Sequence, residues 1–559
     1  MSIRLDLRQT HFGREVSHSI PLVLAKELVA APATPDVDGA HDVIVVDEVD
    51  DAVVNDIVLV SLQDGVAIAS DVEKSWLKTN ILFRENLFFY PYRNALVQRV
   101  GMLDIRLMRE SPEKVRENLR HRGMPEKISE LERLLQLDAD WRREQAEADR
   151  LRKRRNEITQ SIAAARKKGQ DVTPLLKEAE AIPDQIKAVE ARVDNYKQQA
   201  DQILLNLPNL VHESVPVGKD ENDNVEVKKW GTIPDFRFKP LDHIDLGLRH
   251  DLIDVEKAGQ VAGARFYYLR DDLVRLNIAL MHYGLDFIAG KGFQLFQPPN
   301  LLHRNVVAGA VALADFEDVI YKVDGEDLYL LATAEHALLA FHMDEIIDGG
   351  KLPLHYAGVS PCFRKEAGAH GRDTKGIFRV HQFEKVEQFI YSRPEDSWSL
   401  HEELLRNLEE FWQTLKMPYR IVNVCTGDLG AVAAKKYDLE AWLPGQGKYR
   451  EMASCSNCTS YQAVRSRIRY REKSSEPTKY LHTLNSTLVA TERAIVAILE
   501  NYQKPDGAIQ VPEVLREYMG GQETIPGPRE VTPFHQGTVQ KTRLTSTSSS
   551  LRKSKESTD

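Results

Sequence analysis

The most regular pattern of apolar and polar residues lies between residues 126 and 206. In its second half, apolar side chains recur at alternating steps of four and three residues, which is the spacing of a coiled-coil seam. The seam consists of Leu175, Ala179, Ile182, Ile186, Val189, Val193, Tyr196, Ala200 and Ile203. A looser seam runs before it from Leu134 to Ala165. The pattern therefore predicts two long helices.

The segment between the two seams predicts how these helices are connected. Gly169 is suited to end the first helix, and Thr173-Pro174 to start the second. Two helices joined by so short a turn must run antiparallel, and about 40 residues give an arm roughly 60 Å long. Pro183 falls inside the second helix and is expected to kink it or to end it locally.

The rest of the chain has a different texture on each side of this arm. Residues 1–101 contain short apolar runs and acidic turns, and they are either a small α/β appendage or an extension ahead of a true start at Met102. Residues 102–210 form the helical region, and prolines and Asn/Asp turns after residue 206 indicate a linker. Residues 211–526 mix strands and helices in one large α+β domain. The polar tail, 527–559, is predicted to be disordered.

Composition restricts the class of protein. The 559 residues are 42% hydrophobic and 28% charged, which fits a globular protein of two or three domains. No apolar run approaches the roughly 20 residues of a membrane span, and the N-terminus lacks the apolar core of a secretory signal. Four cysteines argue against a disulfide scaffold. A cytoplasmic protein is predicted.

The net charge of −10 means that a nucleic-acid partner must be held by local basic patches. Such a patch lies on the first arm helix and at its tip, in Arg150, Arg152, Lys153, Arg154, Arg155, Arg166, Lys167 and Lys168. A structural coiled coil or a dimerisation device would also carry exposed charge. This run, however, is denser than solubility requires and could neutralise several RNA phosphates.

The segment 361–389 has the composition of a phosphate-binding hairpin. One strand is predicted to end at Phe363–Glu366, and after a loop rich in glycine and charge a second strand returns through Phe378, Val380 and Gln382. Arg364 and Arg379 would then grip a polyphosphate, because guanidinium groups match phosphate oxygens. Phe383 offers a ring for a nucleobase. Taken alone, such arginines are more often surface ion pairs.

A second cluster combines oxygen and sulfur side chains. Glu451 and Ser454 could share a hard cation, which prefers oxygen ligands. Cys455 and Cys458 form a CxxC pair, but tetrahedral zinc needs four ligands and the chain has no second pair. Buried thiols in a strand are therefore the favoured interpretation.

A third cluster precedes an apolar helix near the C-terminus. Thr487 is a candidate N-cap, and Arg493 would project from the first turns of that helix. By itself this pattern indicates only capping and a surface arginine.

The three clusters, in this order, resemble class II aminoacyl-tRNA synthetases. Residues 292–299 resemble the first class motif, at the dimer interface of the family; Phe363–Glu366 resemble the second, and Asn485–Arg493 the third. Thr333–Glu335, the strand around Phe383, residues 451–458 and the preceding arm narrow the resemblance to seryl-tRNA synthetases, over about residues 102–526. It implies an antiparallel sheet with flanking helices after a tRNA-binding arm.

The resemblance also implies residue roles. ATP would be bound by Arg364, Lys365, Glu366, Arg379, Val380, Phe383, Glu451, Met452, Ala453, Ser454 and Arg493, with Arg364, Glu366 and Arg493 as catalytic residues. The adenine would lie between Phe383 and Arg493. Serine would be held by Thr333, Ala334, Glu335, Glu387, Asn485 and Thr487. Mg²⁺ would be held by Glu451 and Ser454, and the basic patch of the arm would contact tRNA.

The implied protein is a homodimer that uses ATP and Mg²⁺ to attach serine to serine tRNA through a seryl-adenylate, with selenocysteine tRNA as a further substrate where one exists. Met452 and Ala453 stand where the family often has Ile-Ser, so one hydroxyl is lost. Two other hypotheses are an amino-acid activator that serves a carrier protein or regulation, and a non-enzymatic RNA-binding scaffold. The arm disfavours the first, and the set Arg364, Glu451 and Arg493 disfavours the second.

Overall fold

We describe the protein from a computed structural model. It describes residues 105–312, 319–366, 373 and 375–525, together with the backbone of five short strands nearer the N-terminus. The chain divides into two compact units, Met1–Ala95 and Leu96–Asp559. In the first unit, β1 (Ser2–Arg4) pairs with β2 (Ser19–Pro21), and β3 (Val43–Val45), β4 (Val58–Leu62) and β5 (Gly65–Ala69) form a three-stranded sheet. The tail predicted to be disordered, 527–559, lies outside the described residues.

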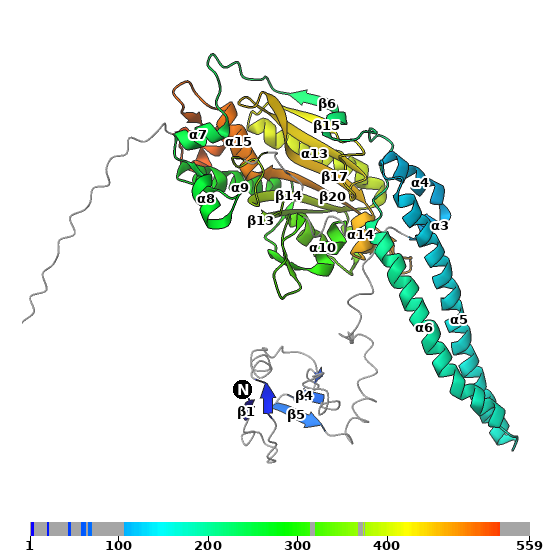
Figure 1. Ribbon diagram of the computed structural model, residues 1–559. Helices are drawn as coiled ribbons and strands as arrows, with labels where there is room; N and C mark the ends of the chain where they lie inside the picture. Colours follow the sequence, from blue (N-terminus) through cyan, green and yellow to red (C-terminus); the bar gives the residue numbers. More distant parts are fainter. Residues whose placement is uncertain are drawn as a thin grey trace, which may run out of the picture. The chain divides into compact units, whose positions relative to one another are not determined.

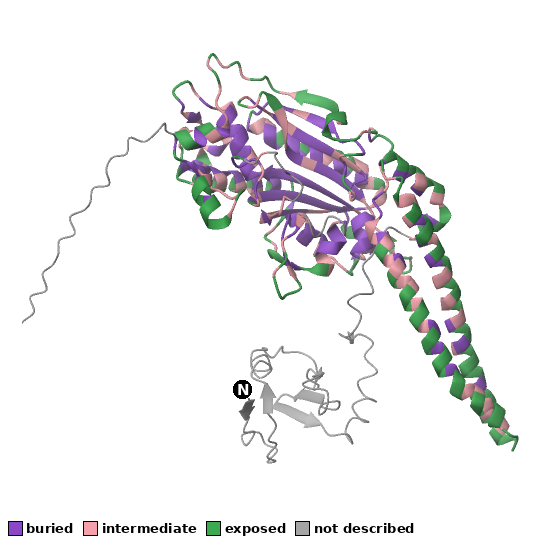
Figure 2. Cartoon of the chain, viewed as in Figure 1, coloured by how far each residue is buried: buried purple, intermediate pink, exposed green. Residues whose placement is uncertain are grey.

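Two long antiparallel helices form the arm that the periodicity predicts (Figure 1). They are α5 (Lys127–Lys167) and α6 (Thr173–Asn206), preceded by α3 (Ile105–Glu110) and α4 (Pro112–His121). Seam side chains such as Leu151, Ile158, Ile186 and Val189 are buried between the helices, whereas the outer faces of the arm are exposed (Figure 2). At the turn, Gly169 has φ +66°, which glycine adopts at little cost.

The helix α6 does not end at Pro183, so that alternative was wrong. A proline inside a helix costs about 3 kcal/mol because it removes one hydrogen bond and crowds the preceding turn. Here Ile182 and Ile186, on either side of the proline, are both buried in the seam. Burial of side chains of this size contributes about 1.5–3 kcal/mol each and outweighs the local defect.

The centre of the second unit is an eight-stranded sheet in the order β6-β15-β16-β17-β20-β14-β13-β9. The strands are β6 (Val225–Trp230), β9 (Gln294–Phe296), β13 (Leu354–Phe363), β14 (Gln382–Ser392), β15 (Tyr419–Asn423), β16 (Lys435–Leu443), β17 (Lys448–Thr459) and β20 (His482–Ala490). All neighbouring pairs are antiparallel except β9 and β13. This sheet and the arm confirm the predicted α+β fold.

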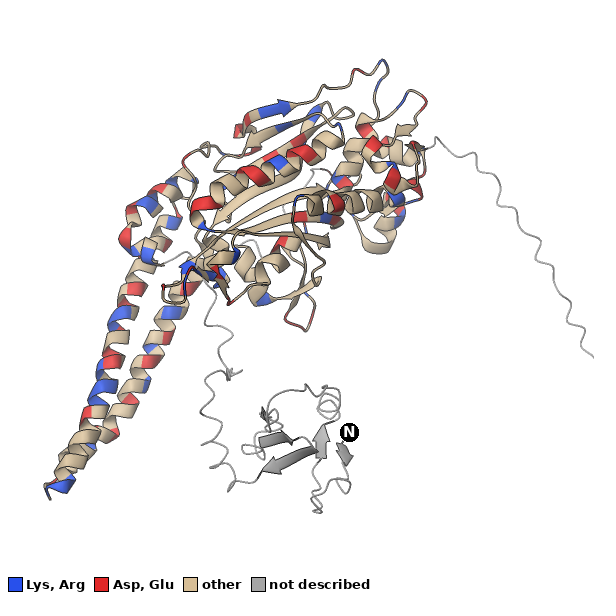
Figure 3. Cartoon of the chain, turned by 180° about the vertical axis from the view of Figure 1, so that it is seen from behind, with Lys and Arg blue, Asp and Glu red and all other residues tan. Residues whose placement is uncertain are grey.

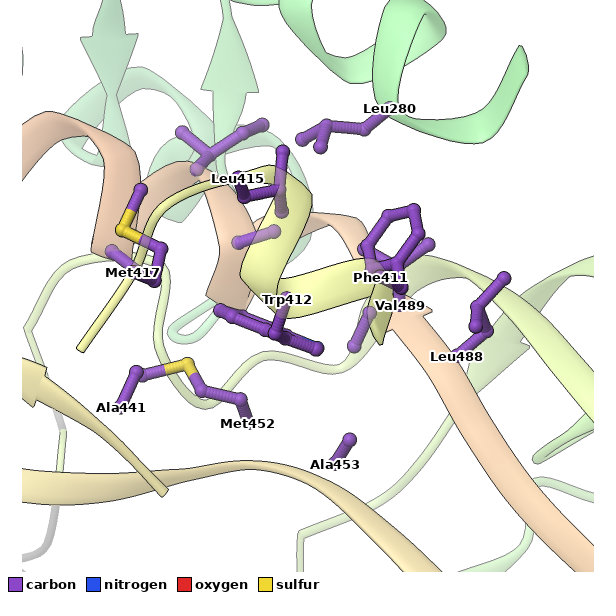
Figure 4. Close-up of a cluster of buried hydrophobic side chains, with 14 of the residues drawn as sticks. Leu280, Phe411, Trp412, Leu415, Met417, Ala441, Met452, Ala453, Leu488 and Val489 are labelled. Atoms are coloured by element: carbon purple, nitrogen blue, oxygen red, sulfur yellow. The ribbon is translucent and has the colours of Figure 1, made fainter. Parts of the chain in front are cut away.

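Helices flank the sheet and supply much of the core. They are α7 (His243–Arg249), α8 (Val255–Ala262), α9 (Asp272–Gly290), α10 (Arg304–Ala310), α12 (Ala334–Ala340), α13 (Ser397–Thr414), α14 (Tyr461–Arg465) and α15 (Thr491–Asn501). Apolar side chains of α9, α13 and α15 pack with the sheet in the largest buried cluster, in which Trp412 and Met452 are labelled in Figure 4. Among the described residues, no helix is both long and apolar enough to cross a bilayer.

Short strands form four small sheets in the same unit. They are β7 (Ile253–Asp254), β8 (Tyr268–Leu269), β10 (Leu301–His303), β11 (Leu328–Leu330), β12 (Ile346–Asp348), β18 (Arg469–Arg471), β19 (Lys479–Tyr480), β21 (Ile509–Gln510) and β22 (Thr524–Ile525). They form three two-stranded sheets, β7-β8, β10-β11 and β21-β22, and one three-stranded sheet, β12-β18-β19.

Two local predictions were wrong. The returning strand of the hairpin begins at Gln382, because Phe378 and Val380 are buried from an irregular segment and do not join the ladder. Thr487 is not an N-cap, because it lies inside β20 while α15 begins at Thr491. The buried thiols were predicted correctly: Cys455 and Cys458 are both buried in β17.

Candidate functional site

A polar cavity opens where β14, β17 and β20 meet the first turn of α15. It is lined by Arg364, Glu366, Phe378, Arg379, Val380, Phe383, Lys385, Glu451, Met452, Ala453, Ser454, Thr487, Ala490, Glu492 and Arg493. The three sequence clusters, which span about 130 residues of chain, therefore meet in one place. Of the residues predicted to bind ATP, Lys365 is missing from this lining; its backbone N–H donates to the carbonyl of Val319 at 2.9 Å.

A β-bulge brings the candidate cation ligands together. In the β16–β17 ladder, Leu439 pairs with Ala453 and Glu440 with Glu451, which leaves Met452 as the extra residue. Without a bulge, residues three apart on a strand point to opposite faces. The inserted residue restores the alternation, so that Glu451 and Ser454 both reach the cavity while Met452 packs beside Trp412 (Figure 4).

Basic side chains keep Glu451 ionised. Burial alone would raise the pKa of this carboxyl, but the charges of Arg493, Lys436, Arg364 and Arg379 outweigh it and hold the pKa at about 2. Arg493 is the nearest of them, with Nη1 3.4 Å from Glu451 Oε1 and 2.9 Å from its backbone oxygen. A carboxylate inside such a basic group is suited to accept a cation together with phosphate groups.

Aromatic rings and guanidinium groups alternate along the cavity. The guanidinium carbon of Arg364 lies 5.3 Å from the centre of the Phe383 ring. The Phe378 ring lies 5.1 Å from Arg493 and 4.0 Å from Arg450. Sequence reasoning placed Phe378 only in a strand. Its buried position next to the arginine of the third cluster makes it a second flat surface beside the cavity.

The two hairpin arginines are held by different kinds of partner. Arg379 Nη1 donates to Glu366 Oε2 at 2.9 Å, whereas Arg364 Nε donates to the carbonyl of Ala332 at 3.3 Å. Glu366 has φ +50°, a backbone conformation that most residues avoid. Both guanidinium groups therefore line the cavity in fixed positions.

A second cavity adjoins the first and shares Arg364 and Ser454 with it. Its polar wall includes Thr333, Glu335, His336, Ser456, Cys458 and Asn485, and its apolar wall is formed by residues around Val311 and Val432. Ala334 and Glu387, also predicted to hold serine, are not among its described lining residues, and Thr487 lines only the first cavity. The Cβ of Ala334 packs against Gly358 of β13, where an added Cβ would lie only 2.7 Å away.

Glu335 is the central acid of this second cavity. Its Oε1 accepts hydrogen bonds from Gln462 Nε2 at 2.6 Å and from Asn485 Nδ2 at 3.1 Å. Burial and, secondly, the nearby Glu387 raise the pKa of Glu335 to about 7. Thr333 caps α12, because its hydroxyl oxygen accepts from the backbone N–H of Glu335 at 3.3 Å.

Glu387 lies between a cation and a hydroxyl. A second bulge, at Leu488, pairs Glu387 with Thr487 across β14 and β20. Thr487 Oγ1 donates to Glu387 Oε2 at 3.1 Å, and the ammonium of Lys385 forms a buried salt bridge with the same oxygen. Lys385 was missed by sequence reasoning, although it lies within the strand that carries Phe383 and Glu387.

The arm carries its charges in alternation, with basic and acidic side chains interleaved along both helices (Figure 3). Of the five arginines and lysines between residues 150 and 155, three pair with carboxylates of the arm: Arg150 with Glu147, Arg152 with Asp149 and Glu190, and Arg154 with Glu157 and Glu178. Lys153, Arg155 and the basic tip (Arg166, Lys167 and Lys168) are exposed, and within the described residues no salt bridge occupies them.

Comparison with known families agrees with this arrangement. The seryl-tRNA synthetase N-terminal domain matches residues 102–211, and the class II tRNA synthetase core domain (G, H, P, S and T) matches residues 319–502. The chain is 52% identical over 424 residues to the serine–tRNA ligase of Nitrosopumilus maritimus, covering 76% of this chain and 100% of the relative. It is 51% identical to that of Pyrococcus horikoshii, over 76% of this chain and 98% of the relative.

Solved structures give the same result. The crystal structure of seryl-tRNA synthetase from Pyrococcus horikoshii complexed with ATP matches with a TM-score of 0.73 at 51% identity, over 76% of this chain and all of the other. A cytoplasmic serine–tRNA ligase from Naegleria fowleri in complex with AMP matches with a TM-score of 0.69 at 37% identity, over 77% and 100%. With its helical arm, antiparallel sheet and shared cavity, the chain belongs to the seryl-tRNA synthetase family of class II aminoacyl-tRNA synthetases.

Proposed function

We propose that this chain activates serine with ATP and transfers the seryl group to serine tRNA. One observation carries the proposal: Arg364, Phe383, Glu451 and Arg493, from distant parts of the chain, line one cavity that adjoins the pocket of Glu335. A basic, aromatic cavity fits a nucleoside triphosphate, and a small polar pocket fits the amino acid.

In the first step, a carboxylate oxygen of serine attacks the α-phosphorus of ATP, and pyrophosphate leaves with the electrons of the broken P–O bond. Arg364 contacts the α-phosphate, Arg379 faces the pyrophosphate, and the adenine lies between Phe383 and Arg493. In the second step, a ribose hydroxyl of the terminal tRNA adenosine attacks the adenylate carbonyl, and AMP leaves. The protein contributes mainly position and positive charge.

Mg²⁺ fits the donor set of the cavity. Glu451 stays ionised, and the bulge at Met452 places the Ser454 hydroxyl on the same face. Mg²⁺ in nucleotide sites is bound by one or two protein oxygens together with phosphates. Glu451 and Ser454 would hold the ion, which would neutralise charge on the departing pyrophosphate. Among the described residues, no group of three or more potential metal-ligating side chains occurs.

Selection of serine follows from the buried acids. Glu335, which lines the second cavity, and Thr487, which lines the first and is held by Glu387, would offer hydrogen-bond partners to the ammonium and hydroxyl groups of serine. An amino acid without the hydroxyl leaves these buried groups unpaired, which strongly disfavours its binding. Rejection of threonine depends on the shape of the pocket and not on additional hydrogen bonds.

The arm is the proposed tRNA-binding element. Arginines already paired with carboxylates must exchange these partners for phosphates, whereas the basic tip, Lys153 and Arg155 are available directly. Double-stranded RNA is recognised by shape and backbone contacts, because its deep major groove excludes side chains. Long basic helices are suited to this type of contact.

A homodimer is supported by apolar side chains exposed on and near the first class motif. Leu295 of β9 is 44% exposed, and Phe341 after α12 is 54% exposed. Phe341 contacts Phe296 of β9, with 5.0 Å between ring centres, so these elements adjoin. Neighbouring apolar residues exposed in this way indicate a protein interface.

We also place the reaction in the cytoplasm, where four unpaired cysteines remain reduced.

Two assays on the full chain test the proposal. Serine-dependent exchange of pyrophosphate into ATP measures adenylate formation, and charging of a serine tRNA transcript measures transfer. We expect both, with no exchange when alanine or threonine replaces serine. Absence of exchange would contradict the proposal, and exchange without charging would favour activation for another acceptor. Chromatography with light scattering should show a dimer that Leu295→Glu weakens.

A further inference from the structure

The short helix α14 connects two parts of the molecule that the proposed function uses separately. It follows β17 in the chain and lies beside the C-terminal end of α6 (Figure 1). Its side chains Tyr461, Gln462 and Arg465 are almost completely buried. All three are polar, and each forms hydrogen bonds to other segments of the chain.

On one side, α14 is bonded to the end of α6. Arg465 Nη2 donates to the carbonyl of Leu205 at 2.6 Å, and the Tyr461 hydroxyl donates to the carbonyl of Leu207 at 3.0 Å. Arg465 Nη2 also donates to the Tyr461 hydroxyl at 2.5 Å. The last carbonyls of a helix lack partners within it and attract cations. These bonds therefore fix the C-terminal end of the arm to α14.

On the other side, α14 reaches the pocket of Glu335. Gln462 Nε2 donates to Glu335 Oε1 at 2.6 Å and to the carbonyl of Ala310 at 3.3 Å, and its Oε1 accepts from Thr483 at 2.7 Å. Both the nitrogen and the oxygen of the Gln462 amide are hydrogen-bonded, so the amide has a fixed orientation and in turn fixes the carboxylate of Glu335. Arg465 Nη1 donates to the carbonyl of Val311 at 3.0 Å, in the apolar wall of the same pocket.

The segment before α5 is also tied to lining residues of this pocket. The Arg122 guanidinium donates to the carbonyl of Gly430 at 2.6 Å and to that of Ala433 at 2.9 Å. Residues 429–433 line the pocket together with Val311. The end of α6 is thus linked through Arg465 to the lining of the serine pocket, and Arg122, which precedes α5, is hydrogen-bonded to that lining directly.

Stability alone is a weak reason for this network. A buried guanidinium loses its hydration, and burial lowers the pKa of Arg465 accordingly. Apolar replacements of buried charged groups are often neutral or stabilising. A polar network that is hydrogen-bonded both to the arm and to the pocket of Glu335 instead transmits a displacement of one to the other, because its side chains have few alternative arrangements.

We propose that α14 couples the arm to the serine pocket. Gln462 is a positioning residue that holds Glu335, while Tyr461 and Arg465 tie it to the end of α6. The inference rests on the proposed function, in which tRNA binds the arm and serine binds at Glu335. By thermodynamic reciprocity, bound tRNA changes the affinity for serine by the same factor by which serine changes the affinity for tRNA.

The test measures the dissociation constant of serine by calorimetry on the full chain, with and without a saturating serine tRNA transcript. We expect tRNA to change this constant about fivefold or more in the wild-type protein. Tyr461→Phe removes only the hydroxyl, and it should leave the constant without tRNA within about twofold while reducing the effect of tRNA. Gln462→Met should raise the constant about tenfold with an unchanged KM for ATP.

Matched controls separate coupling from general damage. Tyr419→Phe removes a buried hydroxyl that donates to Glu409 at 2.9 Å, and Gln503→Met removes a buried amide bonded to Leu241, both away from the pocket. Both should keep the wild-type effect of tRNA. The inference is overturned if Tyr461→Phe keeps the full effect, or if wild-type protein with normal pyrophosphate exchange shows no effect of tRNA. Loss of exchange in the wild-type protein would instead contradict the proposed function.

Discussion

Replacement of Thr487 by valine isolates one hydrogen bond in the proposed serine site. The substitution keeps the branched shape of the side chain and the β-strand preference, but it removes the hydroxyl that donates to Glu387 at 3.1 Å. Glu387 is 2% exposed and Thr487 7% exposed, so water does not readily replace the lost donor. The salt bridge from Lys385 remains and keeps the carboxylate paired.

The expected magnitude follows from the charge of the acceptor. A hydrogen bond to a buried charged group contributes about 1.5–3 kcal/mol. At about 1.4 kcal/mol per factor of ten, the KM for serine should rise about 10- to 150-fold in pyrophosphate exchange. The KM for ATP should change much less, because Arg364, Phe383 and Arg493 are untouched. The variant also removes from the cavity lining the hydroxyl that would contact serine.

Thr426→Val is the matched control. Thr426 is also buried, but its hydroxyl contacts the backbone of Gly218 outside both cavities. It should lower the midpoint of thermal unfolding without changing the KM for serine. If Thr487→Val changes the KM for serine by less than twofold, the pair of Thr487 and Glu387 does not hold serine, and the assignment of these residues is wrong.

Four further outcomes are expected. Because the pKa of Glu335 is raised to about 7, it loses its charge as pH falls below that value, so the KM for serine should rise about fivefold from pH 7 to 6 and be flat in Glu335→Gln; a constant KM would contradict this. Gly358→Ala should displace Ala334 and lower the free energy of unfolding by about 1–3 kcal/mol in urea, with a higher KM for serine; unchanged stability would show that α12 can move freely. Replacement of all three residues of the basic tip by alanine should reduce by about 2–3 the slope of the logarithm of the tRNA binding constant against the logarithm of salt concentration, with pyrophosphate exchange intact. Arg150→Ala should reduce this slope less, because the charge of Arg150 is already paired. A slope equal to that of the wild-type protein would exclude the tip as a tRNA contact. Removal of residues 1–101, which precede the matched domains, should leave exchange and charging unchanged; loss of either would give this segment a role.

Short-range patterns predicted much of this protein from sequence. The seam of the arm repeats every three to four residues, and burial of that seam is the main contribution to the arm, so its helices follow from local spacing. The arginines and carboxylates of the three clusters were recognised because their residue types fit phosphate and cation chemistry. Their order along the chain then indicated the fold.

Tertiary structure alone decided how these residues meet. The extra residues at Met452 and Leu488 set which side chains face the cavity, and a bulge depends on the neighbouring strand and not on local sequence. Thr487 resembled a helix cap until its strand partner, Glu387, was known. Gln462 gave no signal at all, because its role comes from contacts with residues more than 100 positions away in the chain. Periodicity encodes what a segment buries, whereas the contacts of a polar side chain exist only after distant segments have packed.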